Sequence, residues 1–373
     1  MKNRRFLLIL ALLLSIGFVL AACGSSDDGE SSGDGGDSGE GSTEGGEESS
    51  EDFSVAMVTD VGGVDDKSFN QSSWEGLQAF GEENGLEEGE GYDYAQSDSE
   101  GDYTTNISRL VRQDYDLIYG IGYLLQPALE EVAEQNPDTN FGLVDSVSEV
   151  ENIVSITFKE QEGSFLAGVA AALKTETDKI GFVGGEDGSL IRKFESGYVA
   201  GAKSINPDIE IDIQYAESFA AADRGKLIAS NMYNNDIDVI YHASGATGNG
   251  VFAQAKDIKQ NNPDENVWVI GVDRDQHEEG AIGDDNVTLT SMVKRVDVAV
   301  NEIATQTMEG DFPGGEVVEY GLEDEAISIA QTNEDAMTED ILSEIESWKE
   351  QISNGDITVP STDEELEEYE SSL

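Results

Sequence analysis

Cysteine, histidine and positive charge are all scarce in this sequence, and each shortage excludes a class of protein. The 373 residues include one cysteine and two histidines. A single cysteine allows no intrachain disulfide, no Cys-x-x-Cys redox pair and no cysteine-based zinc site. Two histidines leave little for a histidine metal cluster or a histidine-dependent catalytic triad. Only 20 Lys and Arg stand against 79 Asp and Glu, a formal net charge of −59, and such a polyanion repels phosphate backbones, which excludes nucleic acid as a partner.

The N-terminal segment has the pattern of an exported protein. Residues 2–5 are basic, residues 6–22 are apolar, and the apolar run stops at Cys23, as in a secretory signal peptide. A single transmembrane anchor is the alternative, because an apolar run of this length is just long enough to span a bilayer. The end of the run, Leu-Ala-Ala-Cys, resembles a bacterial lipobox. That resemblance implies cleavage after residue 22, lipidation of Cys23 and a protein anchored on the outer face of the cytoplasmic membrane.

Residues 23–52 and 361–373 flank the part of the chain that is expected to fold. After Cys23, the first of these segments contains only Gly, Ser, Thr, Asp and Glu, so it has no apolar side chain to bury and is expected to form a self-repelling tether. The second segment is expected to be an acidic tail. The acidic residues between them are also abundant, which favours a surface adapted to a saline habitat, where salt screens the repulsion. An acidic surface without that adaptation is the alternative.

Residues 53–360 alternate short apolar strands with amphipathic helices. The expected strands are Phe53–Thr59, Tyr92–Gln96, Asp116–Ile121, Asn140–Val144, Ile153–Phe158, Lys179–Val183, Ile209–Tyr215, Val239–His242, Val267–Val272 and Val287–Met292. The expected helices lie near 68–84, 103–113, 126–135, 161–174, 191–204, 222–234, 249–260 and 294–309. This alternation predicts an α/β fold with parallel sheets covered on both faces. So many strands are too many for one ordinary sheet, so two doubly wound lobes are expected.

Ligands of open α/β sheets bind beyond the carboxyl ends of the strands, so the residues that follow each strand are the candidates. Two phenylalanines, Phe69 and Phe194, lie near helix starts in different lobes; they are either core residues or two rings that sandwich a planar base. Asp273 and Lys294 also follow strands, and together they could hold a vicinal diol. A salt bridge to a neighbouring acid is the alternative for Lys294. His242 is expected to be a packing residue.

No catalytic constellation stands out from the sequence. It contains no GxxxxGK[ST] phosphate loop and no GxSxG elbow with a base, and paired carboxylates mean little among so many acids. We therefore expect a binding protein without a cofactor or metal, not an enzyme.

Several segments, in this order, resemble the BMP or PnrA-like family, the substrate-binding lipoproteins of ABC transporters. They are TDVGGVDDKSFNQSSWEGL, YGIGYLL, EGSFLAGVAA, IGFVGG, LIRKFESGYVAG, ASGATGNGVF, IGVDRDQ and TSMVKRVDVAV, and the match covers roughly residues 53–330. The resemblance implies a type I periplasmic-binding-protein fold with two lobes, three interlobe crossings and a nucleoside in the cleft. On this basis lobe 1 should comprise residues 53–158 and a return segment near 274–320. Lobe 2 should comprise residues 159–273 and part of the C-terminal segment.

The same resemblance assigns the candidate site residues. It implies that Phe69 and Phe194 sandwich the base, that Asp60 hydrogen-bonds the base edge, and that Asp273 and Lys294 bind the ribose hydroxyls. The remaining candidates are a glutamine where the family often has asparagine, two glycines that allow close approach of the backbone, and a weaker helix-entry candidate: Gln126, Gly245, Gly248 and Asn70.

The function that the resemblance implies is delivery of a nucleoside, a purine more than a pyrimidine, to a membrane permease. A partner ATPase would supply the energy, and the binding protein itself should be monomeric and attached to the membrane by its lipid. A sugar or another small polar ligand on the same scaffold is one alternative. A surface sensor that does not transport is the other.

Overall fold

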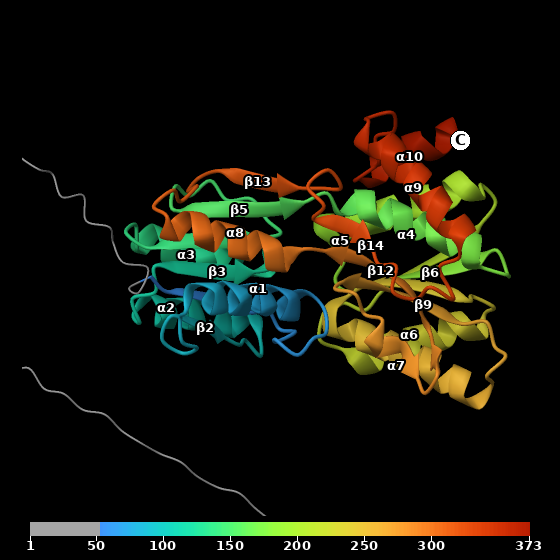
Figure 1. Cartoon of the computed structure of the whole chain (residues 1–373), viewed down its shortest axis with the longest axis horizontal. Coiled ribbons are helices and arrows are strands. Elements are labelled where there is room, and N and C mark those ends of the chain that lie inside the picture. The colour runs from blue at the N-terminus through green and yellow to red at the C-terminus, as the bar shows by residue number, and fades with distance from the viewer. Residues whose placement is uncertain (1–52) are drawn as a thin grey trace, which may run out of the picture. The chain divides into compact units, whose positions relative to one another are not determined.

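The computed structural model describes residues 53–373, and these form two lobes, each built on a six-stranded sheet (Figure 1). The expected signal peptide at 1–22, the lipidated Cys23 and the tether lie outside the described residues. Within residues 53–373, no helix is long and apolar enough to cross a membrane.

The first lobe is a parallel sheet with strand order β13-β5-β4-β3-β1-β2. Its strands are β1 (Val55–Val58), β2 (Tyr92–Ala95), β3 (Leu117–Ile121), β4 (Asn140–Val144), β5 (Ile153–Phe158) and β13 (Val317–Tyr320). Its helices are α1 (Phe69–Asn84), α2 (Tyr103–Val111), α3 (Gln126–Gln135) and α8 (Val296–Met308). Alternate residues of β1 enter two separate cores, Met57 with Leu77 of α1 and Val58 with Leu129 of α3, because successive strand side chains point to opposite faces.

The second lobe has strand order β14-β12-β9-β8-β6-β7, parallel except for β14. Its strands are β6 (Lys179–Gly184), β7 (Glu210–Tyr215), β8 (Val239–Ala243), β9 (Trp268–Asp273), β12 (Thr288–Lys294) and β14 (Ile327–Ile329), with a small hairpin of β10 (Ala281–Ile282) and β11 (Asp285–Asn286). Its helices are α4 (Glu160–Lys174), α5 (Ser189–Ile205), α6 (Ala222–Asn234), α7 (Gly248–Asn261), α9 (Glu339–Ser353) and α10 (Asp363–Ser372).

Helices α4 and α5 pack backbone to backbone, which fixes the position of α5. A Cβ atom on Gly201 would lie 1.9 Å from the carbonyl oxygen of Phe165, and one on Gly197 would lie 2.2 Å from that of Gln161. Neither contact is possible for a larger residue, so glycine at these two positions lets the helices approach closely. Because α5 carries Phe194, this contact also fixes one wall of the candidate site.

Every strand and helix that the sequence predicted is present. One lobe boundary is wrong: residues 274–294 were placed in the first lobe, but β12 pairs with β9 in the second sheet. The lobes are therefore joined by three connections, at Phe158–Glu160, Lys294–Val296 and Tyr320–Ile327. The expected acidic tail also contains helix α10, which packs on α5 through a hydrogen bond of 2.8 Å between the hydroxyls of Tyr369 and Ser204.

Candidate functional site

A cavity lies between the lobes, with about 550 Å³ of empty space when the open solvent at its mouth is included. Loops at the carboxyl ends of strands from both sheets line it, as expected for open α/β sheets. Most of the candidate residues line this cavity, namely Asp60, Phe69, Asn70, Phe194, Gly245, Asp273 and Lys294.

Two aromatic rings flank the cavity, one from each lobe. Phe69 is the first residue of α1 and Phe194 lies in the second turn of α5. The Nζ atom of Lys294 lies 5.1 Å from the Phe69 ring centroid and 5.6 Å from that of Phe194, so the two centroids are no more than about 11 Å apart. Both rings contribute to the cavity wall, and both also belong to the packing of the hydrophobic core, Phe194 as a buried member and Phe69 packed against it.

At one end of the cavity, the carboxylate of Asp60 is held by donors from its own loop. Its Oδ1 accepts hydrogen bonds from the Gly62 N–H at 2.8 Å and from Asn70 Nδ2 at 2.7 Å. Its Oδ2 has no hydrogen-bond partner within residues 53–373 and is left for a ligand. Burial is the main reason that the pKa of Asp60 is raised to about 6.

Asn70 orients Asp60. Its Nδ2 donates to Asp60 and, at 3.0 Å, to Asp66, while its Oδ1 accepts from the Asp60 N–H at 3.2 Å. Asp66 in turn accepts hydrogen bonds from the N–H groups of Ser68, Asn70 and Gln71, which are among the free donors at the start of α1. The helix start and the cavity carboxylate thus form one hydrogen-bonded unit.

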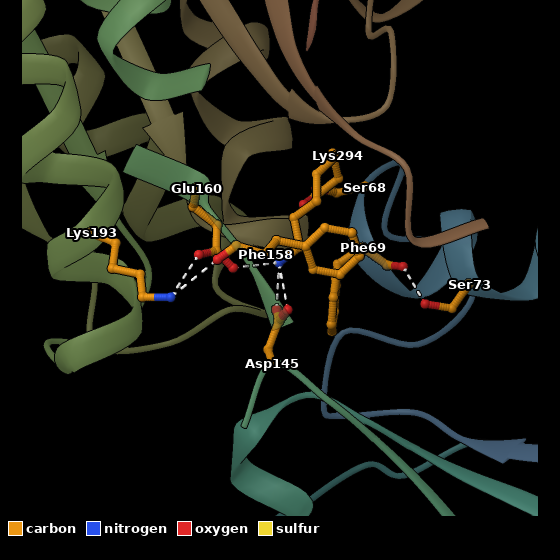
Figure 2. Close-up of polar contacts among 9 residues, drawn as sticks. Ser68, Phe69, Ser73, Asp145, Phe158, Glu160, Lys193 and Lys294 are labelled. Atoms are coloured by element: carbon orange, nitrogen blue, oxygen red, sulfur yellow. Dashed lines mark hydrogen bonds and ion pairs between the residues drawn. The ribbon is translucent and has the colours of Figure 1, made fainter. Parts of the chain in front are cut away.

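Lys294, another residue of the cavity wall, lies between two carboxylates (Figure 2). Its Nζ is 2.7 and 2.6 Å from the two oxygens of Asp145 and 3.3 Å from Glu160 Oε1. Burial opposes the charge of this lysine, but the two carboxylates outweigh it and raise the pKa of Lys294 above its ordinary value. The salt bridge considered as an alternative is present, and Lys294 nevertheless lines the cavity.

Asp145 also lines the cavity and was not predicted from the sequence. It follows β4 directly, so the strand-end rule that identified Asp60, Asp273 and Lys294 would also have found it. Burial raises the pKa of Asp145 to about 6, although Lys294 acts in the opposite direction.

Asp273 ends β9 in a left-handed backbone conformation, with φ of 67°. Its carboxylate accepts a short hydrogen bond from the hydroxyl of Ser68, in the opposite lobe, instead of bonding to Lys294. Burial raises the pKa of Asp273 to about 7 and outweighs the opposing effects of Lys294 and Ser68. Asp273 is therefore placed both to bind a ligand and to join the lobes.

Gln126 and Gly248 do not line the cavity, so the structure does not bring them together with the other candidates. The Gln126 amide donates to Val147 O at 2.8 Å and accepts from Ser146 Oγ at 2.6 Å, which ties it to the loop behind the cavity. A Cβ atom on Gly248 would lie 2.1 Å from the ring of His242, so this glycine makes room for a side chain in the core.

His242 is buried, as expected for a packing residue, and its Nε2 lies 2.9 Å from Gln276 Oε1. Burial lowers the pKa of His242 to about 4, so the imidazole is neutral at physiological pH. Within residues 53–373, no group of three or more His, Cys, Asp or Glu side chains is arranged to hold a metal ion.

Further contacts, at the cavity wall and outside it, hold the lobes against one another. Arg274 of the second lobe forms a two-point ion pair with Glu75 of α1, with N–O distances of 3.0 and 2.8 Å. Gln276 Nε2 donates to Lys67 O at 2.8 Å, and the rings of Tyr123 and Phe219 meet edge to face, with centroids 6.3 Å apart. Tyr123 and Phe219 line the cavity and were not predicted as site residues. The two lobes are therefore in direct contact in the described structure.

Comparison with known proteins gives consistent matches along the whole described chain. The family described as "ABC transporter substrate-binding protein PnrA-like" matches residues 53–363. The chain is 53% identical to the CD4+ T-cell-stimulating antigen of Listeria innocua and 44% identical to the ABC transporter nucleoside-binding protein BmpA of Lactococcus lactis, in each case over 96% of this chain and 99% of the relative. A crystal structure of an ABC transporter solute-binding protein from Aeropyrum pernix is similar with a TM-score of 0.76 at 26% identity, covering 85% of this chain and 98% of that one.

Proposed function

This chain belongs to the PnrA-like family of ABC transporter substrate-binding proteins, and we propose that its ligand is a nucleoside, a purine nucleoside in preference to a pyrimidine one. Its two lobes have the type I periplasmic-binding-protein fold that the sequence predicted. The family is one of solute-binding proteins, so the cavity is a binding site for cargo.

The observation that carries this proposal is the pair of phenylalanines, one from each lobe, in the wall of a cavity that buried carboxylates also line. A flat heterocycle offers two faces, and each stacked ring contributes about 0.5–1.5 kcal/mol beyond the area it buries. The printed name of the Lactococcus relative, a nucleoside-binding protein, supports the same ligand class.

Each end of the cavity suits one part of a nucleoside. Asp60 Oδ2 would accept a hydrogen bond from a ring N–H or an exocyclic amine of the base. Asp273 and Asp145 would accept hydrogen bonds from the ribose hydroxyls, and Lys294 would donate to a hydroxyl oxygen. The free carboxylate oxygen at the base end and the charge cluster at the sugar end match the two polar ends of the ligand.

A nucleotide is a poor fit to the same site. The cavity wall carries the carboxylates of Asp60, Asp66, Asp145 and Asp273 and only one basic residue, Lys294. The Lys294 ammonium already pairs with Asp145 and Glu160, so a ligand phosphate would meet a surplus of negative charge. A neutral nucleoside carries no such penalty.

Binding and transport follow from closure of the lobes. In the mechanism we propose, a nucleoside enters the open protein, bridges residues of both lobes and stabilises the closed form, which docks on the permease. A partner ATPase hydrolyses ATP, and this chain acts as a monomer. We also propose that Cys23 is lipidated and holds the protein on the outer face of the cytoplasmic membrane. Replacement of Cys23 by serine should then move the protein from the membrane fraction to the soluble fraction.

The test of the ligand is calorimetry of the purified protein with a panel of nucleosides, free bases and pentoses. Nucleosides should bind most tightly, purines ahead of pyrimidines, and free bases and ribose should each bind more weakly than the matching nucleoside. Tight binding of a pentose with no binding of any nucleoside would contradict the proposal. Release of free base from inosine during the incubation would indicate an enzyme instead.

A further inference from the structure

The strands that lead into the three connections end at residues that pack together, and Figure 2 shows two of them, Phe158 and Lys294, beside the buried carboxylates of Asp145 and Glu160. Phe158 ends the strand before the first connection, Lys294 the strand before the second, and Tyr320 the strand before the third. The Phe158 ring stacks on Tyr320, with centroids 5.5 Å apart, and its centroid lies 4.9 Å from Lys294 Nζ. The candidate sugar-binding lysine is thus part of the hinge itself.

Glu160 is the carboxylate that ties this cluster together. It begins α4, directly after the first connection, and is fully buried. Its Oε1 lies 3.3 Å from Lys294 Nζ, and its Oε2 lies 3.2 Å from Lys193 Nζ. Lys193 also donates to the carbonyl oxygen of Phe158 at 3.1 Å. One buried acid therefore serves two lysines, one at the sugar end of the cavity and the other next to Phe194 on α5.

The geometry gives Glu160 a role that does not require contact with a ligand. It does not line the cavity, whereas both Lys294 and its other partner, Asp145, do. Three carboxylate oxygens lie within 3.3 Å of the Lys294 ammonium nitrogen, two from Asp145 and one from Glu160. Without Glu160, Lys294 would be held by Asp145 alone. The ammonium group would then be oriented by one carboxylate instead of two.

We propose that Glu160 is a positioning residue for the sugar end of the ligand. It sets the place of Lys294 at the hinge and links that lysine, through Lys193, to the helix that carries Phe194. This inference rests on the proposed function, because it assigns the hydroxyl groups of a nucleoside to Lys294 and Asp145. If Glu160 has this role, a ligand bound at the sugar end acts, through Lys294, on the connections that must bend when the lobes close.

Glu162 provides a matched control in the same helix turn. Its carboxylate accepts a hydrogen bond from the Leu322 N–H at 3.0 Å and lies 3.8 Å from Lys159 Nζ, so it also holds two connections together. It touches neither Lys294 nor Lys193 in the described structure. If these substitutions only weakened the hinge, Glu162→Gln and Glu160→Gln should change ligand binding in the same way. If Glu160 positions Lys294, only Glu160→Gln should weaken the nucleoside more than the free base.

The experiment measures the dissociation constants of guanosine and of guanine by calorimetry for the wild type, Glu160→Gln, Lys193→Met and Glu162→Gln. Glu160→Gln should weaken guanosine about tenfold or more and guanine less than about threefold, because the neutral amide lacks the negative charge that holds Lys294 and has one acceptor oxygen for two lysines. Lys193→Met should change the ratio of the guanosine and guanine dissociation constants in the same direction by a smaller factor. Glu162→Gln should leave that ratio as it is in the wild type.

Two results would overturn the role of Glu160. One is a ratio of guanosine to guanine dissociation constants that is unchanged in Glu160→Gln, and the other is an equal change of this ratio in Glu162→Gln. Should thermal unfolding show that Glu160→Gln does not fold, Lys193→Met decides, and an unchanged ratio in that variant overturns the inference. A wild type that binds no nucleoside in the full panel refutes the proposed function and this role with it. If the wild type binds guanosine but Glu160→Gln has the same ratio of guanosine to guanine dissociation constants as the wild type, the role of Glu160 is refuted and the proposed function is not.

Discussion

Asp145 and Lys294, which are 149 positions apart in the sequence, form a buried ion pair in which both carboxylate oxygens lie within 2.7 Å of the ammonium nitrogen. Asp145 comes from the first lobe, and Lys294 ends a strand of the second. Ion pairing of two buried groups avoids the large cost of an isolated buried charge. The pair also leaves both residues at the cavity surface, where they can exchange hydrogen bonds with hydroxyl groups of a ligand.

Replacement of Asp145 by asparagine should therefore weaken binding of a ribonucleoside much more than binding of its free base. The loss should be about tenfold or more for the nucleoside, because a charged acceptor at the sugar end becomes a neutral amide. Calorimetry with guanosine, 2′-deoxyguanosine and guanine would measure it. Asp236→Asn is a suitable control, since that carboxylate is 80% exposed and contacts only Lys179. Equal losses for guanosine and guanine would contradict a role of Asp145 at the sugar.

The two phenylalanines should behave differently from Asp145. Phe69→Ala should weaken nucleoside and free base by similar factors, about three- to tenfold, because stacking is common to both ligands. Phe69→Tyr keeps the ring and should retain most of the affinity. Phe194 is 3% exposed, so Phe194→Ala should also lower the free energy of unfolding by about 3 kcal/mol. A Phe69→Ala variant that binds guanine as tightly as the wild type would exclude stacking by this ring.

The sequence predicted both sheets apart from their edge strands β13 and β14, and seven of its nine candidate residues line the cavity, because strand–helix alternation and strand-end position are local signals. Which side chains form ion pairs is not a local property, because nothing in the sequence near Lys294 indicates that Asp145 is its partner. Helix α10 was interpreted as part of a tail because its sequence is rich in acidic residues. Its contact with α5 depends on Tyr369 and is not apparent from that composition. Gln126 was assigned to the cavity by family position alone, and its three neighbours in the structure show that its amide is already satisfied by Ser146, Val147 and Glu130.

Nucleoside affinity should rise as the pH increases from about 5 to about 8. Burial raises the pKa of Asp60 to about 6 and that of Asp273 to about 7, and both groups must be ionised to accept hydrogen bonds from the ligand. Binding should therefore release protons in this range, which calorimetry in buffers of different ionisation enthalpy detects. Asp273→Asn should remove the upper part of the pH dependence. Affinity that is constant from pH 5 to 8, with no proton release, would count against both assignments.

The stability of the free protein should change with pH in the opposite direction. For Asp60 and Asp273 the pKa in the folded state lies above the ordinary value of 3.8, so the folded protein binds more protons than the unfolded chain between pH about 4 and 7. The contribution of these groups to the free energy of unfolding thus falls as the pH rises through that window. Denaturant titrations of the wild type and of Asp273→Asn should show a shallower decline in the variant. An identical decline in both would show that Asp273 does not titrate in this range.

The ion pair between Glu75 and Arg274 should stabilise the closed form whichever ligand is bound. It spans the lobes outside the cavity, so Arg274→Met should weaken nucleosides and free bases by the same factor. Both side chains are partly exposed, which limits the expected loss to about threefold. Calorimetry at low and at molar salt would measure it, and the difference from the wild type should shrink as salt screens the pair. A change in the nucleoside-to-base ratio would show that Arg274 acts on the ligand instead.

Salt should stabilise the whole fold. The chain carries 79 acidic against 20 basic residues, and the described ion pairs engage only a minority of those acids, so repulsion among the unpaired carboxylates lowers the free energy of unfolding at low ionic strength. Because the Debye length falls from about 10 Å at 0.1 M to about 3 Å at 1 M, molar salt removes most of this repulsion. The midpoint of thermal unfolding should therefore rise between 0.1 and 2 M KCl. A midpoint that falls over this range would contradict adaptation of the acidic surface to salt.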